Sequence, residues 1–181
     1  MTKARDLATA GSAFAAVDAT ELGYLDGVTS AIQTQINTKA NSSLPTLTGP
    51  VLIAPEERMT VSATAATGTV NFDASTQGIL YYTTNASGNW TLNVRGTSGA
   101  TLNSILATND SITISFFVTQ GSTAYYMTAF TIDGNAVTPK YSGGTAPSAG
   151  NASSIDIYSF TIIKTASATF TVLGAGPVKY A

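Results

Sequence analysis

The sequence contains neither cysteine nor histidine among its 181 residues. The absence of cysteine excludes disulfides and thiolate nucleophiles, and the absence of both residue types excludes the common structural zinc sites. Without histidine, the chain also lacks the side chain that usually transfers protons near neutral pH. A metal site would need carboxylates and carbonyl oxygens alone, and the sequence has no calcium-binding loop of regularly spaced carboxylates. We therefore expect no cofactor and no metal.

Charge is also scarce, since only 10% of the residues are charged and the formal net charge is -2. Such a chain has no basic field that could gather phosphates by counterion release, so nucleic acid is not an expected partner. It also lacks the run of about 18 apolar residues that a membrane-spanning helix needs, so no membrane insertion is expected. The surface must be polar mainly through the hydroxyl and amide groups of Thr, Ser, Asn and Gln.

Helical signals are confined to residues 18–39. Asp18 with Glu21, and Ser30 with Gln33, fit capping boxes in which a side chain at each end of the first turn satisfies a free backbone amide. Two short helices are therefore predicted, separated by a glycine-containing turn. Isolated helices of this length are marginal in water, so they must pack against neighbours.

A narrow apolar stripe runs along these helices through Leu22, Leu25, Ile32 and Ile36. In heptad terms these residues occupy both seam positions, and isoleucine at both positions favours three parallel strands over two. The stripe predicts a homotrimeric helical stalk. The alternative is that the helical pair packs on the rest of its own chain.

The chain divides into four predicted segments. Residues 1–17 are rich in small side chains and are expected to order only against a partner, as a docking segment. Residues 18–43 form the stalk. Residues 44–58 contain three prolines spaced five apart, which predicts a stiff extended connector. Residues 59–181 form a β-rich head.

Period-two alternation in the head predicts strands with one buried face. In NWTLNVRG, Trp90, Leu92 and Val94 share one side, which predicts that the single tryptophan is buried. In SITISFFVTQG, the residues at 112, 114, 116 and 118 form an apolar face, and Phe117 is a large side chain on the opposite, Thr-rich face. Asp133-Gly134 predicts a tight hairpin turn.

Short strands separated by turn residues at near-regular spacing are typical of sandwiches. The predicted fold is therefore mostly β, an antiparallel β-sandwich of the jelly-roll kind that follows a short α-helical trimeric stalk. Aromatic side chains are the candidate surface contacts, because neighbouring tyrosines in a strand point to opposite faces. The candidates are Tyr82, Phe117, Tyr126 and Tyr141.

Catalysis would require paired carboxylates of the kind that cleave polysaccharides. The head offers four aspartates, each in a turn or at the end of a strand: Asp73, Asp110, Asp133 and Asp156. Turn chemistry accounts for Asp110 and Asp133. Asp73 and Asp156 could approach one another across a trimer interface, but nothing in the sequence indicates that they do. The sequence therefore predicts no enzyme and no catalytic residue.

ELGYLDGVTSAIQTQIN, preceded by TKARDLA, resembles a module near the start of fibre and other structural proteins of tailed phages, especially marine phages and cyanophages. In the head, APEERMTVSATAATGTVNFD, LYYTTNASGNWTLNVRG and APSAGNASSIDIYSFTIIKTASATFTVLG resemble a β domain of such proteins. The resemblance covers most of the chain and implies no catalytic residues.

This resemblance implies a virion component, a trimeric fibre or spike that docks on other virion proteins through its N-terminus. Its exposed head would attach to the host surface, as in a tail fibre, with glycans as possible partners. Two alternatives remain. One is a capsid head fibre or decoration protein, and the lesser one is a fibre enzyme that cleaves polysaccharide.

Overall fold

The computed structural model describes Thr20 and residues 53–181. The predicted docking segment, and the stalk residues Leu22, Leu25, Ile32 and Ile36, lie outside the described residues. Ala54–Ala181 forms one compact unit of its own. Its regular structure is almost entirely β, which confirms the predicted mostly-β class. Among the described residues, no helix is both long and apolar enough to cross a membrane.

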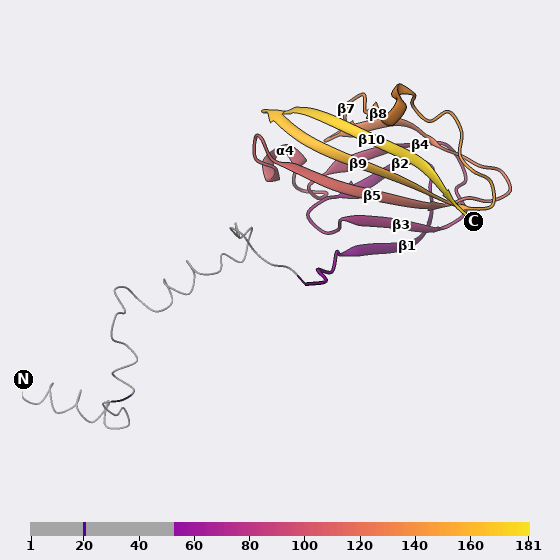
Figure 1. Ribbon diagram of the computed structural model, residues 1–181, viewed down its shortest axis with the longest axis horizontal. Coiled ribbons are helices and arrows are strands. Elements are labelled where there is room, and N and C mark those ends of the chain that lie inside the picture. Colours follow the sequence, from indigo (N-terminus) through magenta and orange to yellow (C-terminus); the bar gives the residue numbers. More distant parts are fainter. Residues whose placement is uncertain (1–19, 21–52) are drawn as a thin grey trace, which may run out of the picture. The chain divides into compact units, whose positions relative to one another are not determined.

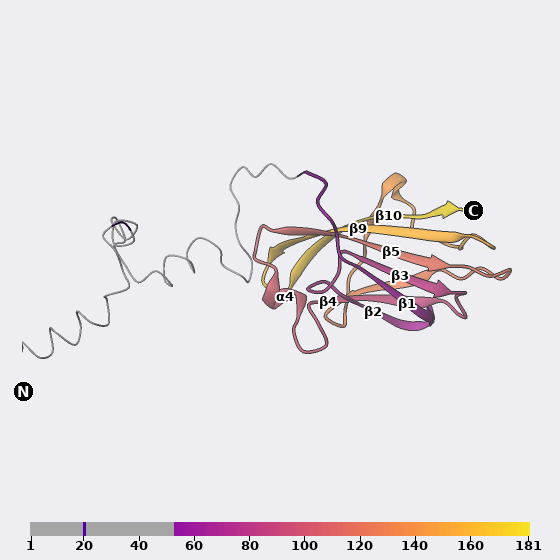
Figure 2. The same ribbon diagram turned by 90° about the horizontal axis from the view of Figure 1, so that it is seen from below.

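Ten strands and two short helices make up the head (Figure 1). In chain order these elements are β1 (Met59–Ala65), β2 (Gly68–Asp73), β3 (Ile79–Thr84), β4 (Trp90–Arg95), α4 (Leu102–Ile105), β5 (Ser111–Thr119), β6 (Met127–Ile132), β7 (Asn135–Ala136), β8 (Lys140–Tyr141), the 3-10 helix η1 (Ser142–Gly144), β9 (Ile155–Ala166) and β10 (Thr169–Tyr180). They form a six-stranded sheet in the order β1-β3-β5-β9-β10-β8 and a four-stranded sheet in the order β2-β4-β6-β7. Figure 2 shows the two layers from below.

The first six strands alternate between the two sheets. Each strand therefore pairs not with the next strand in the chain but with the one after it, and β1, β3 and β5 are parallel neighbours, as are β2, β4 and β6. Parallel strands need a crossover between them. Here the crossover is a strand of the opposite sheet, so the chain winds as a two-sheeted coil. The long strands β9 and β10 then continue the larger sheet in antiparallel pairing.

This pairing differs from the antiparallel jelly-roll arrangement that the sequence predicted. Period-two alternation reports which face of a strand is buried, and it is the same for parallel and antiparallel neighbours. The direction of a neighbouring strand depends on contacts between residues far apart in the chain. Only the hairpin at Asp133-Gly134, where both residues adopt positive φ angles of 53° and 80°, was readable locally, and it is confirmed.

The core lies between the inner faces of the two sheets. Trp90 of the smaller sheet meets the rings of Phe116 and Tyr158 of the larger sheet, each at 5.9 Å between centroids and nearly perpendicular. Phe130 and Phe160 also meet across the layers, at 4.7 Å between centroids and with their planes inclined by 48°. The predicted buried face of β4 is confirmed, since its tryptophan, leucine and valine are at most 1% exposed. On β5, three of the four predicted inner residues are fully buried and Ile112 is partly buried.

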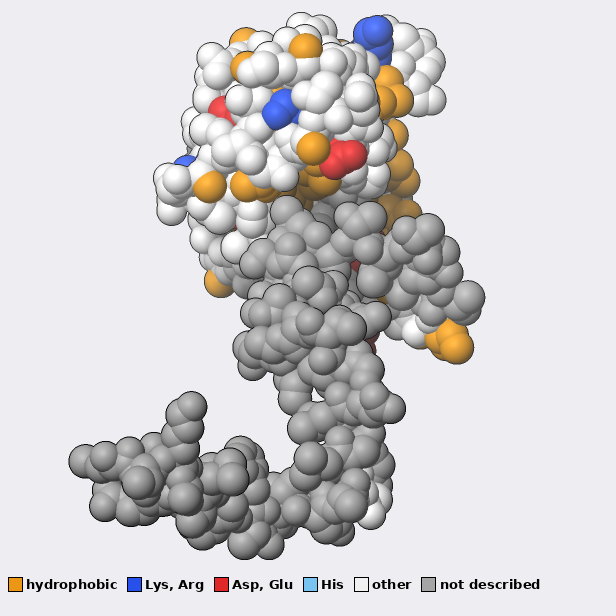
Figure 3. All heavy atoms as spheres, turned by 90° about the vertical axis from the view of Figure 1, so that its left-hand side faces the viewer, with side chains coloured by type: hydrophobic (Ala, Val, Ile, Leu, Met, Phe, Trp, Pro, Cys, Tyr) orange, Lys and Arg blue, Asp and Glu red, His pale blue; other side chains and the backbone are white. Residues whose placement is uncertain are grey.

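Charged side chains are few on the face of the head in Figure 3. White polar atoms and orange apolar side chains dominate it. Hydrophobic side chains also form a band along the right-hand side of the head in this view. The scarcity of charge that the composition indicates is thus visible on this face of the head.

Tyr158 has a hydroxyl that is buried without a hydrogen-bond partner among the described residues. Burial raises the pKa of Tyr158 well above its usual value. The Met127 backbone lowers that pKa by less, because it is close enough to stabilise the ionised oxygen although it lacks the geometry of a full hydrogen bond. Because the folded state resists ionisation, this tyrosine should remove stability as the pH rises above the unfolded-state pKa of about 10.

Tyr158→Phe should therefore lose less stability between about pH 8 and about pH 11 than the wild type. At the lower pH the substitution should change the free energy of unfolding by less than about 1 kcal/mol, because the lost hydroxyl has no partner. Urea unfolding at both pH values measures the difference. Burial also raises the pKa values of Tyr82 and Tyr141, and both tyrosines remain in the variant. The variant should therefore still lose some stability at the higher pH. Equal losses in the two proteins would contradict the prediction.

Candidate functional site

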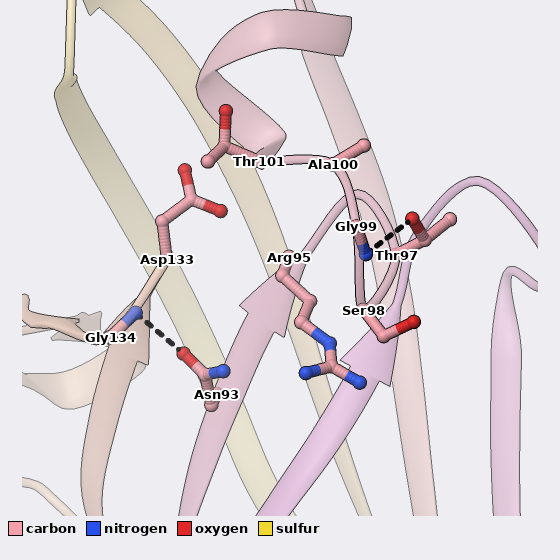
Figure 4. A pocket seen from close by; sticks show the side chains of 9 residues that line it. All are labelled: Asn93, Arg95, Thr97, Ser98, Gly99, Ala100, Thr101, Asp133 and Gly134. Atoms are coloured by element: carbon pink, nitrogen blue, oxygen red, sulfur yellow. Dashed lines mark hydrogen bonds between the residues drawn. The ribbon is translucent and has the colours of Figure 1, made fainter.

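A polar pocket of about 430 Å³ lies beside the end of β4 (Figure 4). Its walls come from three places: the outward side chains Asn93 and Arg95 of β4, the loop at residues 97–101, and the turn at Asp133 and Gly134. The first two segments are adjacent in the sequence, whereas the turn at Asp133 and Gly134 is distant from them and follows β6, so the pocket exists only because β4 and β6 are neighbours in the smaller sheet.

The loop at residues 97–101 is a tight turn held by its own backbone. The amide of Thr97 donates to the carbonyl of Ala100 at 2.9 Å, and the amide of Gly99 donates to the Thr97 hydroxyl at 3.2 Å. A Cβ atom at Gly96 would lie only 2.8 Å from the Ala100 carbonyl oxygen, so glycine is needed where the loop leaves the strand. One wall of the pocket is therefore held in place by the sequence GTSGA.

Asp133 joins the hairpin turn to the start of α4. Its two carboxylate oxygens accept hydrogen bonds from the backbone amides of Leu102 and Asn103 at 2.7 and 3.0 Å. These amides have no partner within the helix, and the carboxylate satisfies both. The hairpin was predicted from the sequence, but this second role of the aspartate was not.

Asn93 fixes the floor of the pocket. Its side-chain oxygen accepts from the amide of Gly134 at 2.9 Å and from the hydroxyl of Thr131 at 2.8 Å. Its side-chain nitrogen donates to the oxygen of Asn71 at 2.8 Å. The asparagine is therefore held by three neighbouring segments, and the polar floor is rigid.

Arg95 provides the strongest donor in the pocket. Its Nε donates to the carboxylate of Asp73 at 2.6 Å, and the two side chains are 28% and 32% exposed. The described residues offer no hydrogen-bond partner to its two terminal nitrogens, which Figure 4 shows below the Ser98 side chain and away from Asp133. Those nitrogens are available to a ligand, and the ion pair holds the guanidinium plane in position.

The pocket thus presents both hydrogen-bond donors and hydrogen-bond acceptors in a small volume. Arg95 and the loop hydroxyls donate, whereas Asp133 and the hydroxyls accept, since each carboxylate oxygen retains a free lone pair. Arg95 lies beside two carboxylates, its partner Asp73 and the pocket residue Asp133, so the site has no excess of positive charge and does not favour an anionic ligand. Among the described residues, no group of acidic side chains is placed to hold a metal ion. The arrangement suits an uncharged molecule with several hydroxyl groups.

The four aromatic candidates from the sequence lie elsewhere. Tyr82 turns its ring toward Phe116 at 5.4 Å, and Tyr141 packs on Phe160 at 6.5 Å. Both tyrosines are therefore partly buried against the core. Tyr141 also lines a second pocket of about 300 Å³ with apolar walls.

The other two candidates are also partly exposed. Phe117 lies on the outer face of the larger sheet beside Tyr81, at 6.0 Å between ring centroids. Tyr126 precedes β6, and its amide donates to the Asn89 side chain at 3.0 Å. The four candidates do not form one platform, because their strands direct them to different faces.

The aspartates considered for catalysis have separate structural surroundings. Asp73 pairs with Arg95, and Asp110 is exposed in a turn. Asp156 is 0% exposed and accepts hydrogen bonds from Gln120 and Asn151. The suggestion that Asp73 and Asp156 meet across a trimer interface is therefore wrong, since a carboxylate buried inside the head cannot reach another copy.

Sequence reasoning did not single out Asn93, Arg95 or Ser98 as site residues. A local signal was present, because one of the few arginines in the head ends a strand and is followed directly by the glycine-containing turn GTSGA. The position of Asp133 opposite this turn was not readable from the sequence.

A comparison of the chain with protein-family models, with curated proteins and with solved structures finds no match.

Proposed function

We propose that this protein is a structural component of a phage virion, a homotrimeric fibre or spike whose β head attaches to glycans on the host surface. The resemblance of its sequence to phage fibre proteins supports the virion assignment. In this proposal, residues 1–17 dock on other virion proteins, and the helical stripe of Leu22, Leu25, Ile32 and Ile36 joins three chains. The polar pocket around Arg95 is the observation on which the attachment role depends.

A glycan fits this pocket chemically. Sugar hydroxyls both donate and accept hydrogen bonds, and the pocket has the free nitrogens of Arg95, the carboxylate of Asp133 and the hydroxyl of Ser98 around one space. Such contacts are individually weak. Three heads per fibre and several fibres per particle would raise the effective concentration and thus the overall strength of attachment.

The head is proposed to bind its glycan without cleaving it. A glycoside hydrolase needs one carboxylic acid and one free carboxylate on either side of the bond to be cleaved. In this pocket Asp133 caps α4 and Asp73 pairs with Arg95. Both carboxylates thus have structural partners, which favours binding over hydrolysis.

Arg95→Met should weaken binding to the recognised polysaccharide by about tenfold or more, which corresponds to about 1.4 kcal/mol. The substitution removes the free donors but leaves the stability within about 1 kcal/mol, because the Arg95–Asp73 pair is partly exposed. Arg58→Met is the matched control, since Arg58 is exposed, lies outside the pocket and carries the same charge. Biolayer interferometry against immobilised neutral and acidic bacterial surface polysaccharides measures both variants.

The outcomes separate the candidate functions. Saturable binding that Arg95→Met alone weakens, with unchanged polymer length, supports attachment through this pocket. Equal binding by the variant and the wild type would place attachment elsewhere on the head. Shortened polymer would indicate a fibre enzyme. Absence of binding to whole host cells and to every polysaccharide would contradict attachment and favour a capsid decoration protein.

A further inference from the structure

The outer face of the six-stranded sheet carries a continuous row of apolar side chains. The strand register aligns one outward residue from each of five neighbouring strands: Val61, Tyr81, Phe117, Ile157 and Val178. Their sequence neighbours on β3, β5 and β9 point into the core, so alternation directs this row away from it. The row crosses the sheet from its β1 edge to β10.

The outer face of the four-stranded sheet is different. Asn71, Asn93 and Thr131 form a hydrogen-bonded ladder across β2, β4 and β6, with contacts of 2.8 Å. Arg95 and Asp73 add an ion pair on the same face. One outer face of the head therefore carries amides and an ion pair, whereas the other combines apolar side chains with the hydroxyl pairs Thr113–Thr161 and Ser115–Ser159 and has no charge on these strands.

Exposed apolar side chains gather on the apolar face. Every large hydrophobic residue of Ala54–Ala181 that is exposed belongs to β1 or β10. Val61 is 62% exposed and Val178 is 49% exposed. Scattered exposed hydrophobic residues are normal, but a contiguous group on one face indicates an interaction surface.

Charge is absent from this face over five strands. The outward positions of β1, β3, β5, β9 and β10 are occupied only by apolar residues, serine and threonine. The charged residues of β9 alternate to the inside, where Asp156 and Lys164 are buried. On the sixth strand, β8, the exposed Lys140 is the neighbour of Leu173, so the uncharged area is that of the other five strands. Two such areas can meet without bringing like charges together or burying a charge, provided that Lys140 stays at the edge of the contact. A second copy of the same chain is therefore a chemically suitable partner.

The face is also large enough. β1, β3, β5, β9 and β10 have 7, 6, 9, 12 and 12 residues. At about 3.3 Å per residue and about 4.8 Å between strands, they cover about 700 Å². A stable protein interface buries about 800 Å² on each partner, so this face comes close to supplying a complete interface.

We propose that the outer face of the six-stranded sheet is the interface through which the heads of neighbouring copies of this chain contact one another. The interface itself does not depend on the proposed function. Only the number of heads that meet, three, rests on the proposed homotrimer. The polar pocket lies on the other sheet, so each head would bury its apolar face and keep its pocket open. Glycan binding and head association can therefore fail independently.

Single cysteines test the proposal, because the natural chain has none and any disulfide must join two copies. We expect at least one of Val61→Cys, Phe117→Cys and Val178→Cys in the full-length protein to form covalent dimers under mild oxidation. Thr69→Cys, on the exposed β2 edge of the polar sheet, is the control for collisions between tethered heads. Cross-linking at the row should exceed the control at least fivefold on non-reducing gels.

A second set of variants uses the same readout. Val61→Glu or Val178→Glu is added to the cysteine variant that cross-links best, at a position that does not carry the cysteine. The glutamate should reduce cross-linking at least fivefold, whereas adding Thr69→Glu should not. The glutamates lie on exposed positions, so the head should still fold, and circular dichroism checks this. No cross-linking at any of the three row positions, or rates equal to the Thr69→Cys control, would overturn the proposal and leave the face for a different partner.

Discussion

Trp90→Ala should lower the free energy of unfolding of the head by about 3 to 5 kcal/mol, enough to unfold much of the population of a marginally stable domain. The side chain is 1% exposed and contacts Phe116 and Tyr158 of the opposite sheet. Alanine would leave a cavity at the point where the two layers meet. Because Trp90 is the only tryptophan, urea unfolding followed by far-ultraviolet circular dichroism is the suitable measurement.

Trp90→Phe is the informative control. The indole N–H of Trp90 is buried without a hydrogen-bond partner among the described residues, so its removal forfeits no hydrogen bond. Phenylalanine also keeps an aromatic ring between the sheets and should cost clearly less than alanine. Val61→Ala, on the exposed outer face, should change stability by about 0.5 kcal/mol or less in the absence of head association. A cost for Trp90→Ala near that of Val61→Ala would show that the layers do not depend on this contact.

Asp156→Asn should cost about 3 kcal/mol, even though the two side chains have nearly the same shape. The carboxylate is fully buried and accepts three hydrogen bonds at 2.7 to 3.1 Å, from the Gln120 side chain and from the amide and side chain of Asn151. Asparagine would replace one acceptor oxygen with an NH₂ group. A donor would then face a donor inside the core, and at least one of these groups would have no partner.

Asp110→Asn removes the same charge from an exposed turn and should change the free energy of unfolding by less than about 0.5 kcal/mol. Urea unfolding of both variants near pH 7 gives the comparison. If the two substitutions cost the same, then the buried network around Asp156 does not contribute to stability. The expected difference would show that Asp156 has a structural role in the core.

The Asp156 network has a further structural consequence. Asn151 belongs to the glycine- and serine-rich loop between η1 and β9, which has few apolar side chains of its own. The buried carboxylate anchors this loop beside Gln120, whose side chain also contacts the backbone of Tyr125. Backbone hydrogen bonds also join the end of this loop to the same segment, from the Ser153 amide to the Gly121 carbonyl and from the Gln120 amide to the Ser154 carbonyl. A segment that reads as a simple polar loop in the sequence is thus attached to the core by these bonds and by a buried ionisable residue.

Local sequence patterns by themselves determined which residues face the core. Trp90, Leu92 and Val94 are buried because side chains alternate along any strand, whatever its neighbours are. Asp133 and Gly134 form the predicted turn because both tolerate a positive φ. The low charge of the surface also follows directly from composition. Each of these features depends on adjacent residues only.

The tertiary structure alone decided which strands are neighbours and what surrounds each polar side chain. β1, β3 and β5 are parallel because the chain crosses to the other sheet after each strand from β1 to β5, and no local pattern encodes that crossing. The same long-range pairing brings Asp133 opposite the loop after Arg95 and encloses Asp156 in the core. Alternation is a property of one strand, whereas a pocket or a buried carboxylate needs several strands in register, and their free energy arises only when distant segments pack together.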